Sequence, residues 1–200
     1  MAKAKAKKPA AKKPAVEARV AEPEPTPKRK IGGERKRAAP GIDTLGPTEV
    51  LGRIALHARA EGEPGDELPI LLARLQEVAT AALVPAMFGV LEDDDPHGVL
   101  WSVFYLLEGF DDDYLAGLVD ALPALRERAP GWADTALLRI INTRGEPEDC
   151  IGAFVALAKR RRAPARKELV TALRELTEGD EPLAPVQKRA ITEMLDALDR

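Results

Sequence analysis

Residues 91–113 read LEDDDPHGVLWSVFYLLEGFDDD, an apolar stretch between two acidic clusters. Its apolar residues recur every three or four positions, which is the spacing of a helix with one buried side. Asp95 stands where it can cap a helix that begins at Pro96. The predicted buried side of this central helix consists of Leu100, Val103, Phe104 and Leu107.

The same helical spacing continues in both directions, and no segment alternates like a β-strand. Proline is tolerated in a first helical turn, because its missing N–H would have no partner there. Asp111 is the expected cap of a further helix, which Pro123 is expected to kink or break. The prolines at which helices are expected to start, Pro96 included, are Pro47, Pro96, Pro130, Pro147, Pro164 and Pro185.

The later starts are 17 to 21 residues apart, so two helices occupy about 34–38 residues, close to the period of known helical repeats. We therefore expect residues 41–200 to form an all-α domain. In this domain antiparallel helix pairs would stack as a short HEAT-like α-solenoid.

The first forty residues have a different composition. Residues 1–40 are mainly Ala, Lys and Pro, and they carry 13 Lys or Arg against 4 Glu, a net charge of +9. So few bulky apolar side chains cannot offset an ordering entropy of roughly 1–2 kcal/mol per residue. We predict a disordered basic tail here. Any contact that it makes with nucleic acid or another polyanion would be weak and salt-sensitive.

Residues 41–200 are acidic. They carry 17 Lys or Arg against 29 Asp or Glu, a net charge of −12, and no basic residue stands between Arg74 and Arg126. A basic arm on an acidic body attracts different partners to its two parts. The single cysteine, Cys150, can form no internal disulfide, and the sequence shows neither an apolar run of about 18 residues nor a secretory signal. These features predict a cytoplasmic protein without a membrane span.

No motif for catalysis, cofactor binding or metal binding stands out. The two histidines, His57 and His97, are not at metal-ligand spacing, and HExxH, CxxC and phosphate-loop motifs are absent. A calcium loop from Asp93 would need Glu at its twelfth position, which is Phe104. We expect no cofactor, no metal and no enzymatic activity. Basic residues at 159–162 and 166–167 are interpreted as charges at helix ends, with a phosphate-binding patch as the alternative.

Four residues at three- and four-residue spacing are predicted to form a line beside the buried side of the central helix. They are His97, Trp101, Tyr105 and Glu108. One acid is enough to cap a helix, whereas three or four stand together at each end of this one. Aromatic side chains surrounded by acids are typical of a surface that binds a basic protein. For Trp101 and Tyr105, a place in or at the edge of the core is the alternative. The predicted partner-binding residues are Asp93, Asp94, Asp95, His97, Trp101, Tyr105, Glu108, Asp111, Asp112 and Asp113.

Several short motifs point to a known family. They are Leu106-Leu107-Glu108, Phe110 with the acids after it, Tyr114, Pro130-Gly131-Trp132 and Arg139-Ile140-Ile141-Asn142. With these motifs, residues 65–175 resemble Immunity protein 30, a family of bacterial polymorphic toxin systems. The resemblance implies an all-α protein that binds and neutralises a cognate toxin encoded beside it.

Two functions remain open at this stage. The first is an immunity protein that binds a cognate toxin, such as a basic nuclease, in stoichiometric amounts through the acidic and aromatic line. The second is a helical-repeat adaptor or scaffold whose basic tail contacts nucleic acid or another polyanion. Deletion of residues 1–40 distinguishes them, because only the second function requires the tail.

Overall fold

The computed structural model describes residues 41–179 and 182–200 of the 200-residue chain. Within these ranges it contains nine α-helices, two short 3-10 helices and no strand, which confirms the all-α prediction. The expected tail, residues 1–40, lies outside the described residues. The helices are η1 (Ile42–Thr44), α1 (Pro47–Ala58), α2 (Leu68–Val78), η2 (Ala81–Leu83), α3 (Val84–Val90), α4 (Leu100–Glu108), α5 (Asp112–Arg128), α6 (Pro130–Asn142), α7 (Ile151–Arg160), α8 (Ala163–Glu178) and α9 (Pro185–Asp199).

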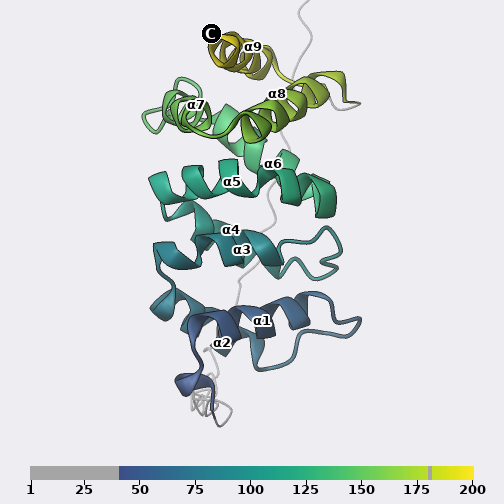
Figure 1. Cartoon of the computed structure of the whole chain (residues 1–200). Coiled ribbons are helices and arrows are strands. Elements are labelled where there is room, and N and C mark those ends of the chain that lie inside the picture. Colours follow the sequence, from purple (N-terminus) through teal and green to yellow (C-terminus); the bar gives the residue numbers. More distant parts are fainter. Residues whose placement is uncertain (1–40, 180–181) are drawn as a thin grey trace, which may run out of the picture. The chain divides into compact units, whose positions relative to one another are not determined.

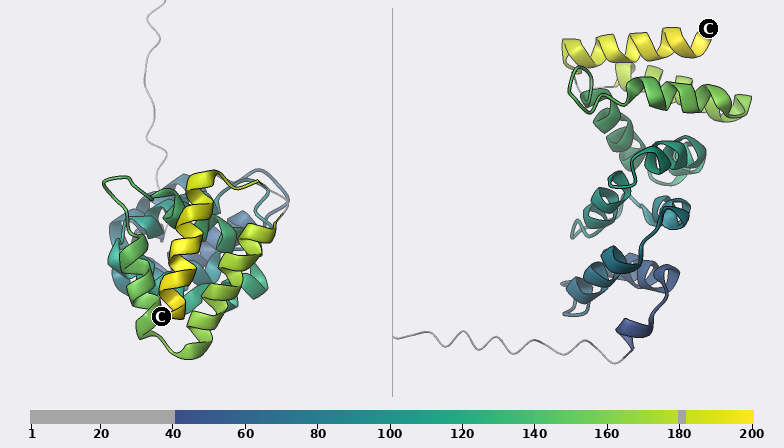
Figure 2. Two further views of the ribbon diagram at one scale, coloured as in Figure 1. Left: turned by 90° about the horizontal axis from the view of Figure 1, so that it is seen from above. Right: turned by 90° about the vertical axis from the view of Figure 1, so that its left-hand side faces the viewer.

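The helices follow one another in space roughly in chain order, from α1 and α2 to α9 (Figure 1). α1 packs against α2, and α9 packs against both α7 and α8. Seen from above in Figure 2, α9 lies between α7 and α8. α5 contacts α3, α6, α7 and α8 and is therefore the element around which the middle of the domain is packed.

α5 supplies a large share of the core. Its buried side chains follow helical spacing, and burial of each large aliphatic one contributes about 1.5–3 kcal/mol relative to exposure. Pro123 lies inside α5 without dividing it, so the break considered for this position does not occur. The predicted buried side of α4 is confirmed, because its four residues are at most 1% exposed. The buried residues of α5 are Tyr114, Leu115, Leu118, Val119, Leu122 and Leu125.

Gly117 allows α3 and α5 to approach closely. A Cβ atom at this position would lie 2.4 Å from Cγ1 of Val84 and 3.2 Å from Cε2 of Phe88. Any larger residue would have to push these core side chains aside, which costs typically 1–3 kcal/mol in a packed interior. The absence of a side chain at residue 117 therefore sets the separation of the two helices.

Four helices begin at the predicted prolines. Pro47, Pro130 and Pro185 are the first residues of α1, α6 and α9, and Pro164 is the second residue of α8. In all four the ring occupies a position whose N–H has no intrahelical partner. This part of the prediction is confirmed.

Two helices begin four residues later than predicted. α4 begins at Leu100 instead of Pro96, and α7 begins at Ile151 instead of Pro147. Gly98, with φ of 66°, places a left-handed residue between Pro96 and Leu100, so a right-handed helix cannot run through it. Before α7, the hydroxyl of Thr143 accepts a hydrogen bond from the backbone N–H of Cys150, which holds this segment as a turn.

Candidate functional site

The acidic cluster before α4 is anchored to the start of α6. The carboxylate of Asp93 accepts hydrogen bonds from the backbone N–H groups of Gly131 (3.0 Å) and Trp132 (3.2 Å). These amides belong to the first turn of α6 and have no partner within the helix. The indole N–H of Trp132 also donates to the backbone carbonyl of Glu92 at 2.9 Å. Asp93 is therefore a cap for a helix that begins 37 residues after it.

Asp95 is not the N-cap residue of α4, which is Val99, but its side chain binds backbone amides at the start of this helix. Its carboxylate accepts hydrogen bonds from the backbone N–H groups of Val99 (2.9 Å) and Leu100 (2.7 Å). Asp94, between the two capping residues, is exposed, and no hydrogen bond or ion pair holds its side chain within the described residues. Two of the three consecutive aspartates thus serve the fold, and Asp94 is left to the solvent.

The tertiary structure brings arginines to the segment that has none in the sequence. Arg59, just after α1, binds the carboxylate of Glu92. Arg139, on α6, binds Glu108 at the end of α4, and one of its two hydrogen bonds measures 2.7 Å. The hydrogen bond to the carboxylate is the main cause that raises the pKa of each guanidinium group. Glu108 is therefore an ion-pair partner and not a free acid.

Two aromatic side chains of α4 are exposed next to this ion pair. Trp101 is 39% exposed and Tyr105 is 57% exposed. The ring of Trp101 lies 5.8 Å from that of Tyr105 and 4.8 Å from that of the buried Trp132. The guanidinium carbon of Arg139 lies over the Tyr105 ring, 5.5 Å from its centre. Core contacts thus support one side of the aromatic pair, while the other side faces solvent.

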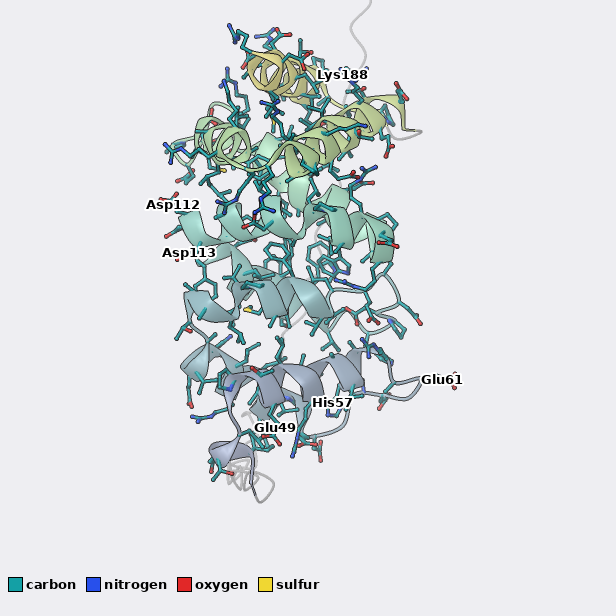
Figure 3. The ribbon with its side chains drawn as sticks, viewed as in Figure 1. Glu49, His57, Glu61, Asp112, Asp113 and Lys188 are labelled. Atoms are coloured by element: carbon teal, nitrogen blue, oxygen red, sulfur yellow. The ribbon has the colours of Figure 1, made fainter. Side chains whose placement is uncertain are left out.

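Asp111, Asp112 and Asp113 stand together at the N-terminal end of α5, and all three are exposed. Figure 3 shows Asp112 and Asp113 at the edge of the ribbon. Asp111 is the N-cap residue of α5, as predicted, but it has φ of 48° and its side chain makes no capping hydrogen bond. Asp112 and Asp113 lie in the first turn, where the helix dipole favours negative charge. Within the described residues, none of the three carboxylates forms an ion pair.

A pocket of about 450 Å³ opens beside these acids. It lies between the end of α4, the start of α5, the C-terminal half of α6 and the connection from α6 to α7. Its apolar wall includes Leu115 and Ile140, and Tyr114 lies at its buried side. The complete lining consists of Glu108, Asp111, Asp112, Tyr114, Leu115, Arg139, Ile140, Thr143, Glu148 and Cys150.

Most of the predicted partner-binding residues lie along one path. Asp93, Asp95 and Trp101 line a shallow pocket with Trp132. From Trp101 the path continues through Tyr105, the Glu108–Arg139 ion pair and the larger pocket. His97 is the exception to the predicted line, since it lies in the turn before α4 and not on the helix. We call the solvent-facing set of Asp94, Trp101, Tyr105, Arg139, Asp111, Asp112 and Asp113 the acidic–aromatic surface.

Sequence reasoning missed Arg139, Glu148 and Thr143 as residues of this region. Each lies more than 25 residues from the acids of the central stretch, and only the packing of α6 against α4 and α5 brings them close. Cys150 is half-buried at the N-terminal end of α7 and lines the pocket. An arginine inside an otherwise apolar helical pattern, such as Arg139, was the one available signal.

The basic residues near α8 divide into two groups. Arg161 forms an ion pair with Asp120 of α5 at 2.8 Å. Arg166, Lys167 and Arg174 instead line a separate open pocket of about 730 Å³ between α8 and α9. Arg161 therefore has a structural partner, whereas Arg166, Lys167 and Arg174 are exposed to solvent.

Residues 41–179 and 182–200 contain no cluster of His, Cys, Asp or Glu able to hold a metal ion. Across the same two ranges, none of the helices has both the length and the apolar character that crossing a membrane requires.

An all-helical domain with exposed aromatic side chains among unpaired acids has the features of a protein-binding module. Residues 63–149 match the family model of Immunity protein 30. The resemblance to this family is confirmed over the matched range, which includes α2 to α6. The match ends earlier than the expected limit at residue 175. No curated protein and no solved structure matched the chain.

Proposed function

We propose that this protein is an immunity protein that binds a cognate bacterial toxin through the acidic–aromatic surface and neutralises it by stoichiometric contact. The match to Immunity protein 30 supports the class of function, and all residues of the surface lie within the matched range. The toxin would be encoded beside the protein. Binding alone would account for the effect, so the proposal includes no catalysis.

The exposure of Trp101 and Tyr105 is the observation that carries the proposal. Only four large apolar or aromatic side chains in the described ranges are exposed, and these two are adjacent; the others are Leu56 and Val186. Aromatic side chains dominate the energy of many interfaces because they bury a large area with little loss of conformational freedom. Here the rings of Phe104 and Trp132 pack against Trp101, and Tyr105 packs against Trp101 in turn.

The charge distribution favours a basic partner. Asp94 and residues 111–113 carry four carboxylates without an ion pair in the described part of the chain. Complementary charge raises association rates to about 10⁸–10⁹ M⁻¹s⁻¹ at low salt. A basic toxin such as a nuclease suits this surface. The proposed site of action is the cytoplasm, because a protein with one cysteine needs no oxidising compartment.

The proposed domain division is a basic tail over residues 1–40 and an immunity-like domain over 41–200. We further propose that the helices of this domain form HEAT-like pairs. The packing of α1 on α2, α5 on α6 and α8 on α9 supports that arrangement.

Co-expression with the product of the adjacent gene tests the proposed function. We expect rescue of growth and a complex that purifies in a fixed ratio. The double variant Trp101→Ala and Tyr105→Ala should lose the complex, whereas Leu56→Ala should retain it. Leu56 is the matched control because it is 65% exposed on α1 and is not one of the residues of the acidic–aromatic surface. Absence of toxicity and of a complex would contradict the proposal.

Deletion of residues 1–40 addresses the alternative of a scaffold that acts through its tail. If the shortened protein still forms the complex and protects cells, the tail is not needed for the main activity. Loss of protection with an intact, folded domain would instead favour the scaffold and polyanion function.

A further inference from the structure

The pocket beside Asp111 and Asp112 contains a buried polar group without a partner. The hydroxyl of Tyr114 is shielded from solvent and has no hydrogen bond within the described part of the chain, and the whole residue is only 5% exposed. An unsatisfied buried polar group is rare in folded proteins, because leaving it unpaired is costly. This hydroxyl is therefore a second observation, independent of the acidic cluster, that points to a ligand.

Tyr114 lines the pocket together with Glu108, Arg139 and Cys150. Burial is the main cause that raises the pKa of Tyr114, and the next cause is the charge of Glu108, while Arg139 acts in the opposite direction. Glu108, Arg139 and Cys150, whose charges influence the phenol, also line the pocket. Tyr114 remains a neutral phenol that can accept or donate one hydrogen bond.

The lining of the pocket selects a cation with an apolar stem. Four carboxylates surround it, and the only basic residue, Arg139, is already paired with Glu108. Asp111, Asp112 and Glu148 therefore leave an excess of three negative charges. Leu115 and Ile140 provide an apolar wall for methylene groups.

We propose that this pocket binds an arginine side chain of the toxin. The guanidinium group has five N–H donors in a fixed plane, so it can serve two carboxylates and the Tyr114 oxygen at the same time. Lysine offers a point charge without that planar geometry. The inference rests on the proposed function and deepens it, since it assigns one anchor of the interface to a defined pocket next to the exposed aromatic pair.

The test uses the full-length protein and two small ligands, followed by NMR. The ligands are N-acetyl-arginine methylamide and its neutral isostere N-acetyl-citrulline methylamide. We expect the arginine ligand to give saturable shifts at Leu115, Thr143 and Cys150. Binding of the citrulline ligand should be at least about tenfold weaker, because it lacks the charge that the carboxylates attract.

Three variants separate binding from folding. Tyr114→Phe and Asp112→Asn should each weaken binding of the arginine ligand several-fold. Asp196→Asn is the control, because Asp196 is an exposed acid on α9, remote from the pocket. Since the Tyr114 hydroxyl has no hydrogen-bond partner among residues 41–179 and 182–200, Tyr114→Phe should not lower the thermal midpoint. Weaker binding together with an unchanged or raised midpoint excludes a merely structural role.

Non-saturating shifts, equal binding of both ligands, or unchanged binding by Tyr114→Phe would overturn the inference. Failure of the proposed function looks different. If the adjacent gene product forms no complex, both the proposed immunity function and the assignment of a toxin arginine to the pocket are refuted. If the complex forms but the arginine ligand does not bind, only the pocket assignment is refuted.

Discussion

Replacement of Asp93 by alanine tests whether the acids before α4 serve the fold or the partner. The variant removes the acceptor for two backbone amides at the start of α6, at 3.0 and 3.2 Å. Loss of a helix cap costs about 0.5–2 kcal/mol, and loss of a charge at the positive end of a helix adds about 0.3–1 kcal/mol. We therefore expect the free energy of unfolding to fall by about 1–3 kcal/mol.

Asp94 provides the matched control. It is the same residue type and the next residue in the chain, and its side chain forms no hydrogen bond or ion pair with the described residues. Asp94→Ala should change the free energy of unfolding by less than about 0.5 kcal/mol, which is usual for surface substitutions. The loss of unfolding free energy for Asp93→Asn should lie between those of Asp93→Ala and Asp94→Ala. The amide oxygen can still accept one of the two hydrogen bonds, but it carries no charge.

Urea unfolding followed by circular dichroism measures these differences. In thermal unfolding, a loss of about 1–3 kcal/mol corresponds to a midpoint lowered by roughly 2–12 °C for a domain of this size. Equal midpoints for Asp93→Ala and Asp94→Ala would refute the assignment of Asp93 as the cap of α6. Asp93, Asp94 and Asp95 would then have to be interpreted as a single cluster of surface acids, which is what their adjacency in the sequence suggests.

Three further predictions concern the surface and the core. Reversal of residues 111–113 to lysine should slow association with the toxin most at low salt, and stopped-flow rates that do not change with the variant would contradict the electrostatic role. Gly117→Ala should lower the free energy of unfolding by about 1–3 kcal/mol, and the additional change Val84→Ala should recover part of the loss if the 2.4 Å contact is the cause. Because burial raises the pKa of Tyr114, the folded state holds this proton more tightly than the unfolded chain, so stability should decrease as the pH rises above about 10, the pKa of an unfolded tyrosine. In unfolding titrations against pH, Tyr114→Phe should show less of this decrease, and an unchanged slope would contradict it.

The electrostatics of the central stretch show the limit of sequence reasoning. The absence of Lys and Arg from residues 75–125 indicated a surface of free acids. In the structure, Arg59 and Arg139 pair with Glu92 and Glu108 from outside that range. Such partners come from segments that are distant in the chain, and their contacts depend on helix packing that local spacing does not specify.

Local patterns in the sequence were enough to predict the helical class, the buried side of α4, four of the helix starts and the family resemblance. These features depend on local periodicity, on proline geometry and on short motifs, all of which are present in consecutive residues. The tertiary structure decided which acids are caps, which are paired and which remain free, and it formed the pocket at Tyr114. Those outcomes depend on contacts between α4, α5 and α6, because the partner of each side chain lies on another helix. The stretch at residues 91–113 thus contains a buried helix side that is visible in the sequence, while its chemical surface is a property of the folded chain.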